Sequence, residues 1–322
     1  MSVMQRIHTM KWFFAIAALS LAALSTTPAT AQNIPRNERI LVDYHDPLDP
    51  ELVYNVDPDD TDDETKKLYA NYREIKAVAD RLKERKVLER YAQFLAPLKL
   101  RTTLRLIGKQ CNQVNAFFNP RENSITLCYE YVRSFENGAP RGQTDDGITR
   151  DDAIIGGLVA TMLHETGHAL FHLFKIPVLG REEDGADQIA AYVMLQFGDQ
   201  VALTTVKGSI WKWRNWGVPV TQESTAFTQQ RIFSDTHSTA QQRFNTFLCI
   251  AYGGKPATFQ SFIDAGYIPK ARAASCRGEY QRAERAFIKT ILPHIDQDLM
   301  NKVRSAQWFY PQDQGAIPVQ TR

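Results

Sequence analysis

The sequence predicts an α+β fold whose C-terminal part is mostly helical. Short strand-like segments gather between residues 98 and 129, and apolar residues recur at helical spacing both before and after them. The chain has 322 residues, of which 43% are hydrophobic and 23% are charged. That is enough for one large domain or two small ones.

The first 31 residues have the pattern of an export signal. Arg6 and Lys11 supply positive charge, Trp12 to Leu24 form an apolar run of 13 residues, and Ala29-Thr30-Ala31 offers a cleavage site. Such a run is shorter than the roughly 20 residues that cross a bilayer, although a retained anchor is the alternative. We expect a signal peptide over residues 1–31, a periplasmic or secreted protein, and no stable membrane span after signal removal.

Charge and cysteine content limit the partners of the mature chain. Loss of Arg6 and Lys11 leaves 36 basic and 36 acidic residues, a balance that gives no reason to expect a nucleic-acid partner. Four cysteines in an exported chain predict two disulfides, and pairing of sequence neighbours is one of three connectivities. A four-cysteine zinc site is disfavoured, because the chain has no C-x-x-C pair. The residues concerned are Cys111, Cys128, Cys249 and Cys276.

Local patterns divide the chain before residue 200. Residues 32–64 are rich in proline and acids and predict an extended, acidic, poorly packed arm. Helical spacing follows over residues 65–95. Strand-like stretches then occur at residues 98–107, 116–118 and 124–129.

Two further helices are expected in the middle of the chain. The first is capped by Thr149 or Asp151 and extends to about Phe174. After a break at residues 177–180, the second begins near Arg181, with acids in its first turn, and ends at Gly198. Residues 201–322 have a mostly helical pattern.

The first of these two helices contains the segment His164-Glu165-Thr166-Gly167-His168, an H-E-x-x-H motif. Residues four apart lie on one helix face, so both imidazoles can bind the same cation. Glu165 lies close to that face and can take a proton from a water activated by zinc. Two surface histidines with an incidental acid are the alternative. Gly167 is costly inside a helix, and close approach of a neighbouring backbone would explain it.

A catalytic zinc needs a third protein ligand and an open position. Glu183, on the next helix, is the best candidate, and Asp187 one turn later can orient a ligand histidine. Glu182, Asp184 and Asp187 are competing ligands. At least two of the acids at positions 182–184 are expected only to complement the helix dipole. His172 is expected to be structural, because each step of four residues turns it away from the metal.

These residues resemble the gluzincin type of zinc peptidase, in which H-E-x-x-H is followed by E-x-x-x-D on the next helix. The chain also resembles, over roughly residues 65–295, a bacterial family of unknown function described as metallopeptidases. The matching stretches are residues 115–120, 125–130, 164–168, 177–184, 235–238, 242–245 and 272–276. The zinc motif is the most specific of them.

The resemblance implies a zincin-like fold, with a small sheet beside the active-site helix and one zinc ion per chain. It implies that Asn115, Ala116 and Phe117 belong to an edge strand that binds an extended peptide. His237, oriented by Asp235, is the candidate donor to the oxyanion formed during hydrolysis. The alternative for that pair is an incidental histidine beside a helix start.

Together these features predict a zincin-like catalytic region at residues 65–200 and a helical region at residues 201–322. The predicted activity is hydrolysis of peptide bonds in a peptide or protein substrate. A zinc amidase acting on cell-wall or other small amides, and a non-catalytic zinc-bearing binding protein, are the alternatives. Trp211, Trp213 and Trp216 are expected to be packing residues, and Arg243 is expected to form a structural ion pair.

Overall fold

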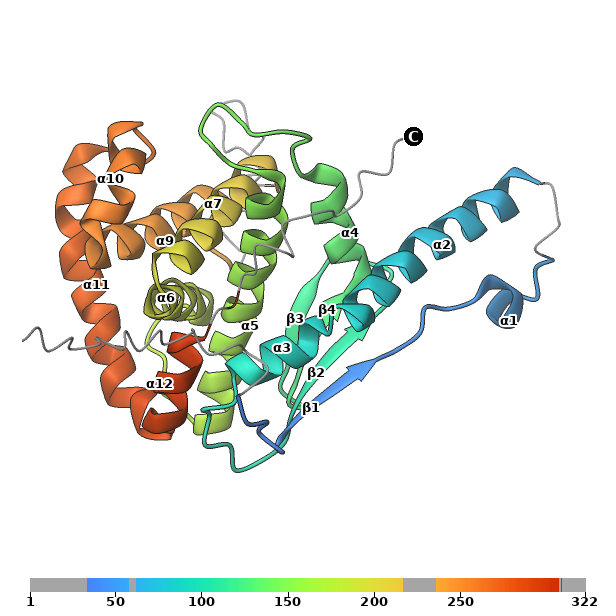
Figure 1. Ribbon diagram of the computed structural model, residues 1–322, viewed down its shortest axis with the longest axis horizontal. Coiled ribbons are helices and arrows are strands. Elements are labelled where there is room, and N and C mark those ends of the chain that lie inside the picture. The colour runs from blue at the N-terminus through green and yellow to red at the C-terminus, as the bar shows by residue number, and fades with distance from the viewer. Residues whose placement is uncertain (1–33, 58–61, 217–235, 307, 309–322) are drawn as a thin grey trace, which may run out of the picture.

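The structure is a computed structural model that describes residues 34–57, 62–216, 236–306 and 308 (Figure 1). The described residues form 11 α-helices and a small sheet of four strands, which confirms the predicted α+β class. The predicted signal peptide, residues 1–31, lies outside the described residues.

The sheet has the strand order β1-β2-β4-β3, so β1 and β3 form its edges. Strand β1 pairs parallel with β2, β2 pairs parallel with β4, and β3 pairs antiparallel with β4. The strands are β1 (Ile40–Tyr44), β2 (Leu104–Lys109), β3 (Ala116–Asn119) and β4 (Ser124–Cys128). All five residues of β4 are buried, as expected for a strand covered on both faces.

Two expectations for the N-terminal half were wrong in detail. The arm over residues 32–64 is not poorly packed throughout, because β1 joins the sheet and Ile34 and Ile40 are buried. The run over residues 98–107 is not one strand. Leu98 forms an isolated bridge with Ile295, and β2 begins only at Leu104, after the polar residues 101–103.

The helices surround the sheet unevenly (Figure 1). Helix α3 contacts β1 and β2, α5 contacts β3 and β4, and the remaining helices pack mainly on α5 and on one another. Their bounds are α1 (Pro50–Tyr54), α2 (Asp63–Glu84), α3 (Val87–Phe94), α4 (Tyr129–Gly138), α5 (Gly157–Phe174), α6 (Glu182–Met194), α7 (Asp199–Trp216), α9 (Ala240–Gly254), α10 (Pro256–Asp264), α11 (Lys270–Thr290) and α12 (Gln297–Ser305).

Helix α5 is the central element of the fold. It continues from a π-helical turn, Asp152–Gly156, whose start is fixed by reciprocal hydrogen bonds between Thr149 and Asp152. Most of α5 is buried between the sheet and helices α6 and α7. Tyr91 of α3 also reaches it, through a 2.7 Å hydrogen bond to Thr166.

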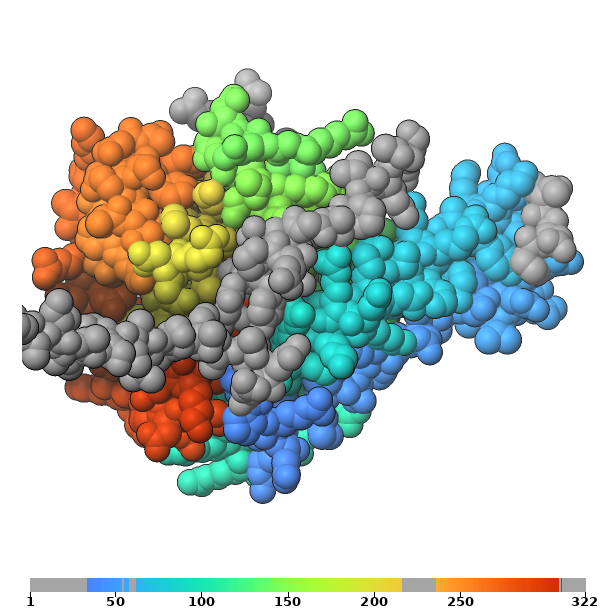
Figure 2. All heavy atoms as spheres, viewed as in Figure 1, coloured from blue at the N-terminus to red at the C-terminus, as the bar shows by residue number. Residues whose placement is uncertain are grey.

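Helix α6 lies between α5 and the C-terminal helices α9 and α11. It ends in a 3₁₀ turn, Leu195–Phe197, and the chain then turns at Gly198 with φ of +90°. In Figure 2 the C-terminal helices form one end of the molecule and the N-terminal part of α2 projects at the other. Most of α5, and α6 from Ala186 onward, lie in the interior of the fold, where packing holds their side chains in fixed positions.

Candidate metal centre

Helix α5 brings the two motif histidines together. His164 is buried and His168 is half-buried, and their rings stand nearly perpendicular, with the Nε2 atoms 3.2 Å apart. This proximity follows from the spacing of four residues in a continuous helix. Both Nε2 atoms therefore point to a common position at the side of α5.

Helix α6 supplies a carboxylate to the same position. Glu183 Oε2 lies 3.1 Å from His164 Nε2 and 3.5 Å from His168 Nε2. The two helices can approach this closely because Gly167 has no side chain. A Cβ atom there would lie 2.8 Å from the Cα atom of Ala186. The close backbone approach that the sequence suggested for Gly167 is present.

The three candidate ligand atoms have the spacing of a zinc site. Their separations are 3.1, 3.2 and 3.5 Å. Ligands about 2.0–2.1 Å from a tetrahedral zinc lie about 3.3–3.4 Å from one another. Glu183 Oε2 is also buried, and within the part of the chain that the structure describes it accepts no well-directed hydrogen bond, so a cation would satisfy this oxygen. The residues therefore fit a zinc ion.

The electrostatics of the site favour a bound cation. Burial opposes ionisation of Glu183, but the imidazoles of His164, His168 and His237 hold the pKa of its carboxyl far below the usual range. Burial lowers the pKa of His168, but the adjacent carboxylates of Glu183 and Glu182 outweigh it and raise that pKa to about 9. The carboxylates thus stabilise positive charge beside them.

The outer nitrogens of both histidines also have acidic partners. His164 Nδ1 lies 2.8 Å from Asp187 Oδ1, and His168 Nδ1 lies 2.7 Å from Glu182 Oε1. Such contacts fix the ring orientation of a ligand histidine and the position of its proton. Asp187 thus occupies the place expected for it, whereas the contact of Glu182 was not foreseen.

Asp187 is itself held by an arginine from another helix. Arg243 of α9 donates to both carboxylate oxygens, at 2.7 and 2.8 Å, so it forms the structural ion pair expected from the sequence. Burial disfavours the charge of Asp187, but bonds from His164 and Arg243 lower its pKa to about 2.

The expectation that at least two acids at positions 182–184 only complement the helix dipole was wrong. Glu182 contacts His168, Glu183 contacts the imidazoles, and Asp184 accepts a 2.6 Å hydrogen bond from Ser238. The sequence could not reveal these contacts, because they depend on which side chains of α5 and of residues 236–239 face the first turn of α6.

Glu165 lies beside the three candidate ligands but points to the sheet. Its Oε2 accepts a 2.9 Å hydrogen bond from the backbone N–H of Phe118 in β3. Burial raises the pKa of Glu165, and the nearby His164 and His168 oppose part of this rise. A carboxylate in this position is suited to accept a proton.

The edge strand β3 lies next to this carboxylate. The N–H groups of Ala116 and Phe118 point away from β4, because they donate to Asn115 Oδ1 and to Glu165. By the alternation of an antiparallel pair, the backbone of Phe117 faces Thr126 of β4. The carbonyl groups of Ala116 and Phe118 point the same way and can accept hydrogen bonds from a bound peptide, whereas the backbone of Phe117 is paired with β4. Period-two alternation would have identified Phe118.

His237 also reaches the site, from the loop before α9. Its Nε2 lies 3.0 Å from Glu183 Oε2, and its side chain is 47% exposed. Asp235, expected to orient it, lies outside the described residues.

The remaining candidates lie away from the ligand atoms. His172 packs against Phe118, with ring centroids 5.7 Å apart. Trp213 packs against Phe244 and Phe247. Trp211 is also packed into the core, as expected, and the side chain of Trp216 lies outside the described residues.

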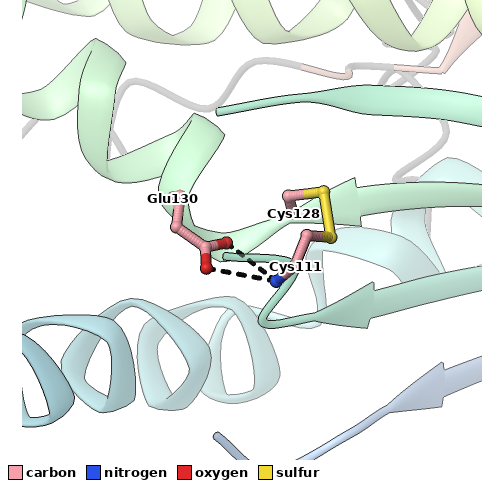
Figure 3. A group of neighbouring side chains, drawn as sticks. All are labelled: Cys111, Cys128 and Glu130. Carbon is pink, nitrogen blue, oxygen red and sulfur yellow. Dashed lines mark hydrogen bonds between the residues drawn. A yellow bond between two sulfur atoms is a disulfide. The ribbon is translucent and has the colours of Figure 1, made fainter. Parts of the chain in front are cut away.

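The cysteines form two pairs at disulfide distance, Cys111–Cys128 and Cys249–Cys276. This is the pairing of sequence neighbours, and it removes the four-cysteine zinc site as an alternative. Glu130 lies close to the first pair (Figure 3), but both sulfur atoms of that pair are bonded to each other.

Comparison with known proteins agrees with the site. No helix among the described residues is long and apolar enough to cross a membrane. No curated protein and no solved structure matches the chain. A family model described as "Putative metallopeptidase" matches residues 69–291, which include both motif helices and the sheet strands β2 to β4. On this match over more than half of its length, the chain belongs to that metallopeptidase family.

Proposed function

We propose that this protein is an exported zinc-dependent peptidase that hydrolyses peptide bonds. The main support is the convergence of His164 Nε2, His168 Nε2 and Glu183 Oε2 within 3.1–3.5 Å of one another. Membership of the metallopeptidase family supports a peptidase function at a coarse level. The zinc ion, the ligand set and the residue roles below are proposals.

His164, His168 and Glu183 would hold the zinc, while Asp187 and Glu182 would fix the two imidazole rings. Zinc, when bound, supplies a Lewis acid that lowers the pKa of water and polarises a carbonyl group. Glu165 accepts the proton of the attacking water and later delivers it to the leaving amine. Burial favours this role, because it raises the pKa of Glu165 above its usual value.

The substrate is a peptide in extended conformation along β3. The outward carbonyl groups of Ala116 and Phe118 accept hydrogen bonds from it, as in other cases of strand addition to a sheet edge. Asn115 marks the end of the bound segment, because its own carbonyl is paired with Cys128 of β4. His237 donates a hydrogen bond to the oxyanion that forms at the attacked carbonyl.

Export of the mature protein is part of the proposal. Two cysteine pairs at disulfide distance and a signal-like N-terminus favour an oxidising compartment such as the periplasm or the exterior.

Metal analysis combined with activity on a peptide panel tests the proposal. Glu165→Gln keeps bound zinc but lowers turnover by about 10²–10⁴-fold, because general base catalysis is lost. Glu183→Ala loses zinc as well. Glu84→Gln, at the exposed end of α2, is the matched control and stays at wild-type level.

Wild-type turnover in Glu165→Gln would exclude the proposed chemistry. If the wild-type protein cleaves small amides but no peptide longer than two residues, the activity is that of an amidase. Stoichiometric zinc in Glu183→Ala would assign the third ligand to another residue.

A further inference from the structure

A buried carboxylate holds the turn that precedes the substrate strand. Glu130 is in the first turn of α4 and is 7% exposed. Both of its oxygens accept the N–H of Cys111 at 3.1 Å (Figure 3). Its Oε1 also accepts the N–H of Asn112 at 2.7 Å.

The charge of Glu130 is balanced by the backbone. Among the described residues, no basic side chain forms an ion pair with it. A buried carboxylate is costly unless hydrogen bonds replace its water, and the N–H groups of Cys111 and Asn112 do so. Asn112 has φ of +56°, a left-handed conformation that asparagine adopts more readily than most residues. The carboxylate stabilises this turn by accepting the N–H groups of both Cys111 and Asn112.

The Cys111–Cys128 disulfide is a second tie at the same turn. It joins Cys111 to the last residue of the buried strand β4. The N–H of Cys128 donates in turn to the carbonyl of Asn115, at 3.2 Å. Residues 113–115, which lead into β3, thus lie between the contacts of Cys111 and Asn112 with Glu130 and the contact of Asn115 with β4.

Further hydrogen bonds connect this turn, through β3, to the candidate metal centre. Asn115 Oδ1 accepts the N–H of Ala116 at 2.9 Å, and two residues later Phe118 donates to Glu165. A shift of the turn would move the outward groups of β3 relative to Glu165.

We propose that Glu130 is a positioning residue, which acts with the Cys111–Cys128 disulfide to hold β3 in the geometry that binds an extended peptide. The part concerning substrate rests on the proposed function, whereas the effect on β3 does not.

Hydrogen exchange of the β3 amides in the mature protein tests the effect on the strand. Glu130→Gln is isosteric but accepts through one oxygen only. It speeds exchange at Ala116 and Phe118 by about tenfold, the factor expected for loss of one charged hydrogen bond. Glu136→Gln, on the same helix and paired with Arg81, is the control and leaves these amides unchanged.

The second disulfide provides a matched control for the first. The pairs Cys111–Cys128 and Cys249–Cys276 have sequence separations of 17 and 27, so their removal loosens the unfolded chain to a similar extent. C111S/C128S speeds exchange in β3, whereas C249S/C276S does not. Unchanged exchange in both Glu130→Gln and C111S/C128S would overturn the proposal.

Kinetics with substrates of two lengths test the consequence for binding. Glu130→Gln raises KM for a hexapeptide by about tenfold with kcat within about twofold, and leaves a blocked dipeptide unaffected. Equal losses on both substrates would show general destabilisation and overturn the positioning role. Faster exchange in β3 together with no cleavage by the wild-type protein would reject the proposed function and leave the role of Glu130 intact.

Discussion

Gly167 stands where α5 crosses α6, and a methyl group at this position has no room. Its Cβ would lie 2.8 Å from the backbone of Ala186, which is flanked on α6 by Glu183 and Asp187. The crossing distance therefore determines whether the acids of α6 reach the histidines of α5. Glycine destabilises a helix by roughly 1 kcal/mol relative to alanine. At this position its lack of a side chain permits the close crossing of the two helices that the site requires.

Gly167→Ala is expected to weaken zinc binding by about 10–100-fold, as other changes behind ligand residues do. It also destabilises the fold by about 1–3 kcal/mol through overpacking. Competition with a fluorescent zinc chelator and thermal unfolding in excess chelator measure the two effects. Gly142→Ala, where an added methyl group would meet nothing within 4 Å, should match the wild type. Wild-type zinc affinity in Gly167→Ala would show that α6 can move without cost.

The sequence could predict which side chains lie close together within one helix, because spacing alone determines this. It could not predict every contact between side chains of different helices. His164 and His168 share a face because of their spacing alone. Glu183 and Asp187 could be proposed because they are one turn apart on the next helix. The contact between Glu182 and His168 could not, because it depends on the side-chain conformation at the exposed start of α6.

At the scale of elements, the junction between the π-helical turn and α7 depends on another glycine. A Cβ at Gly208 of α7 would lie 2.1 Å from Gly157 N and 2.6 Å from Asp152 O. These are backbone atoms, which cannot move aside as a flexible side chain can. The position of the first turn of α5 is therefore fixed by the approach of α7.

Gly208→Ala is expected to destabilise the protein by about 3 kcal/mol or more, at the upper end of overpacking effects. Denaturant unfolding measures the loss. The control is Gly278→Ala in α11, where the nearest atom is the flexible end of Arg282 at 3.5 Å, so a gain of about 1 kcal/mol is expected from helix propensity. Equal stability of the two variants would contradict the close contact.

Element boundaries were predictable where breakers and caps mark them. Gly198 ends the helical stretch that begins with α6, and Thr149 fixes the turn before α5, as their residue types indicate. Strand β1 was missed because a short apolar run within an acidic, proline-containing arm has no periodic signal. Its pairing partner, β2, lies about 60 residues away, and a local pattern cannot contain that information.

At the scale of the whole molecule, Asp146 joins three distant parts of the chain. Burial disfavours its charge, but bonds from Thr144 and Tyr267 and the charge of Arg214 lower its pKa below the usual value. A carboxyl with a lowered folded pKa stabilises the protein above its unfolded pKa of about 3.9, and this stabilisation is lost as the pH falls through the folded pKa.

Asp146→Asn should therefore be less stable than the wild type at pH 7, and the difference should vanish at pH values below the folded pKa of Asp146. Urea unfolding between pH 7 and the acid limit of the native state measures this convergence. Asp264→Asn, at the exposed end of α10, should differ little from the wild type throughout. A difference that is constant with pH would show that the charge of Asp146 is not responsible.

Metal removal is expected to destabilise the whole molecule, because the proposed ligands come from two helices that are packed into its interior. Binding to the native state at 1,000 times Kd adds about 4 kcal/mol, which corresponds to a Tm shift on the order of 10 °C for a chain of this size. Calorimetry with EDTA, and then with excess zinc, should show this shift in both directions.

Two variants show whether the shift depends on the proposed ligands. His172→Ala should retain the Tm shift, because His172 packs against Phe118 and is not a proposed ligand. Glu183→Ala should unfold at the same temperature with and without zinc, since loss of one ligand separates α6 from the ion. A wild-type Tm that does not respond to EDTA or zinc would mean that the close approach of His164, His168 and Glu183 is held by packing alone.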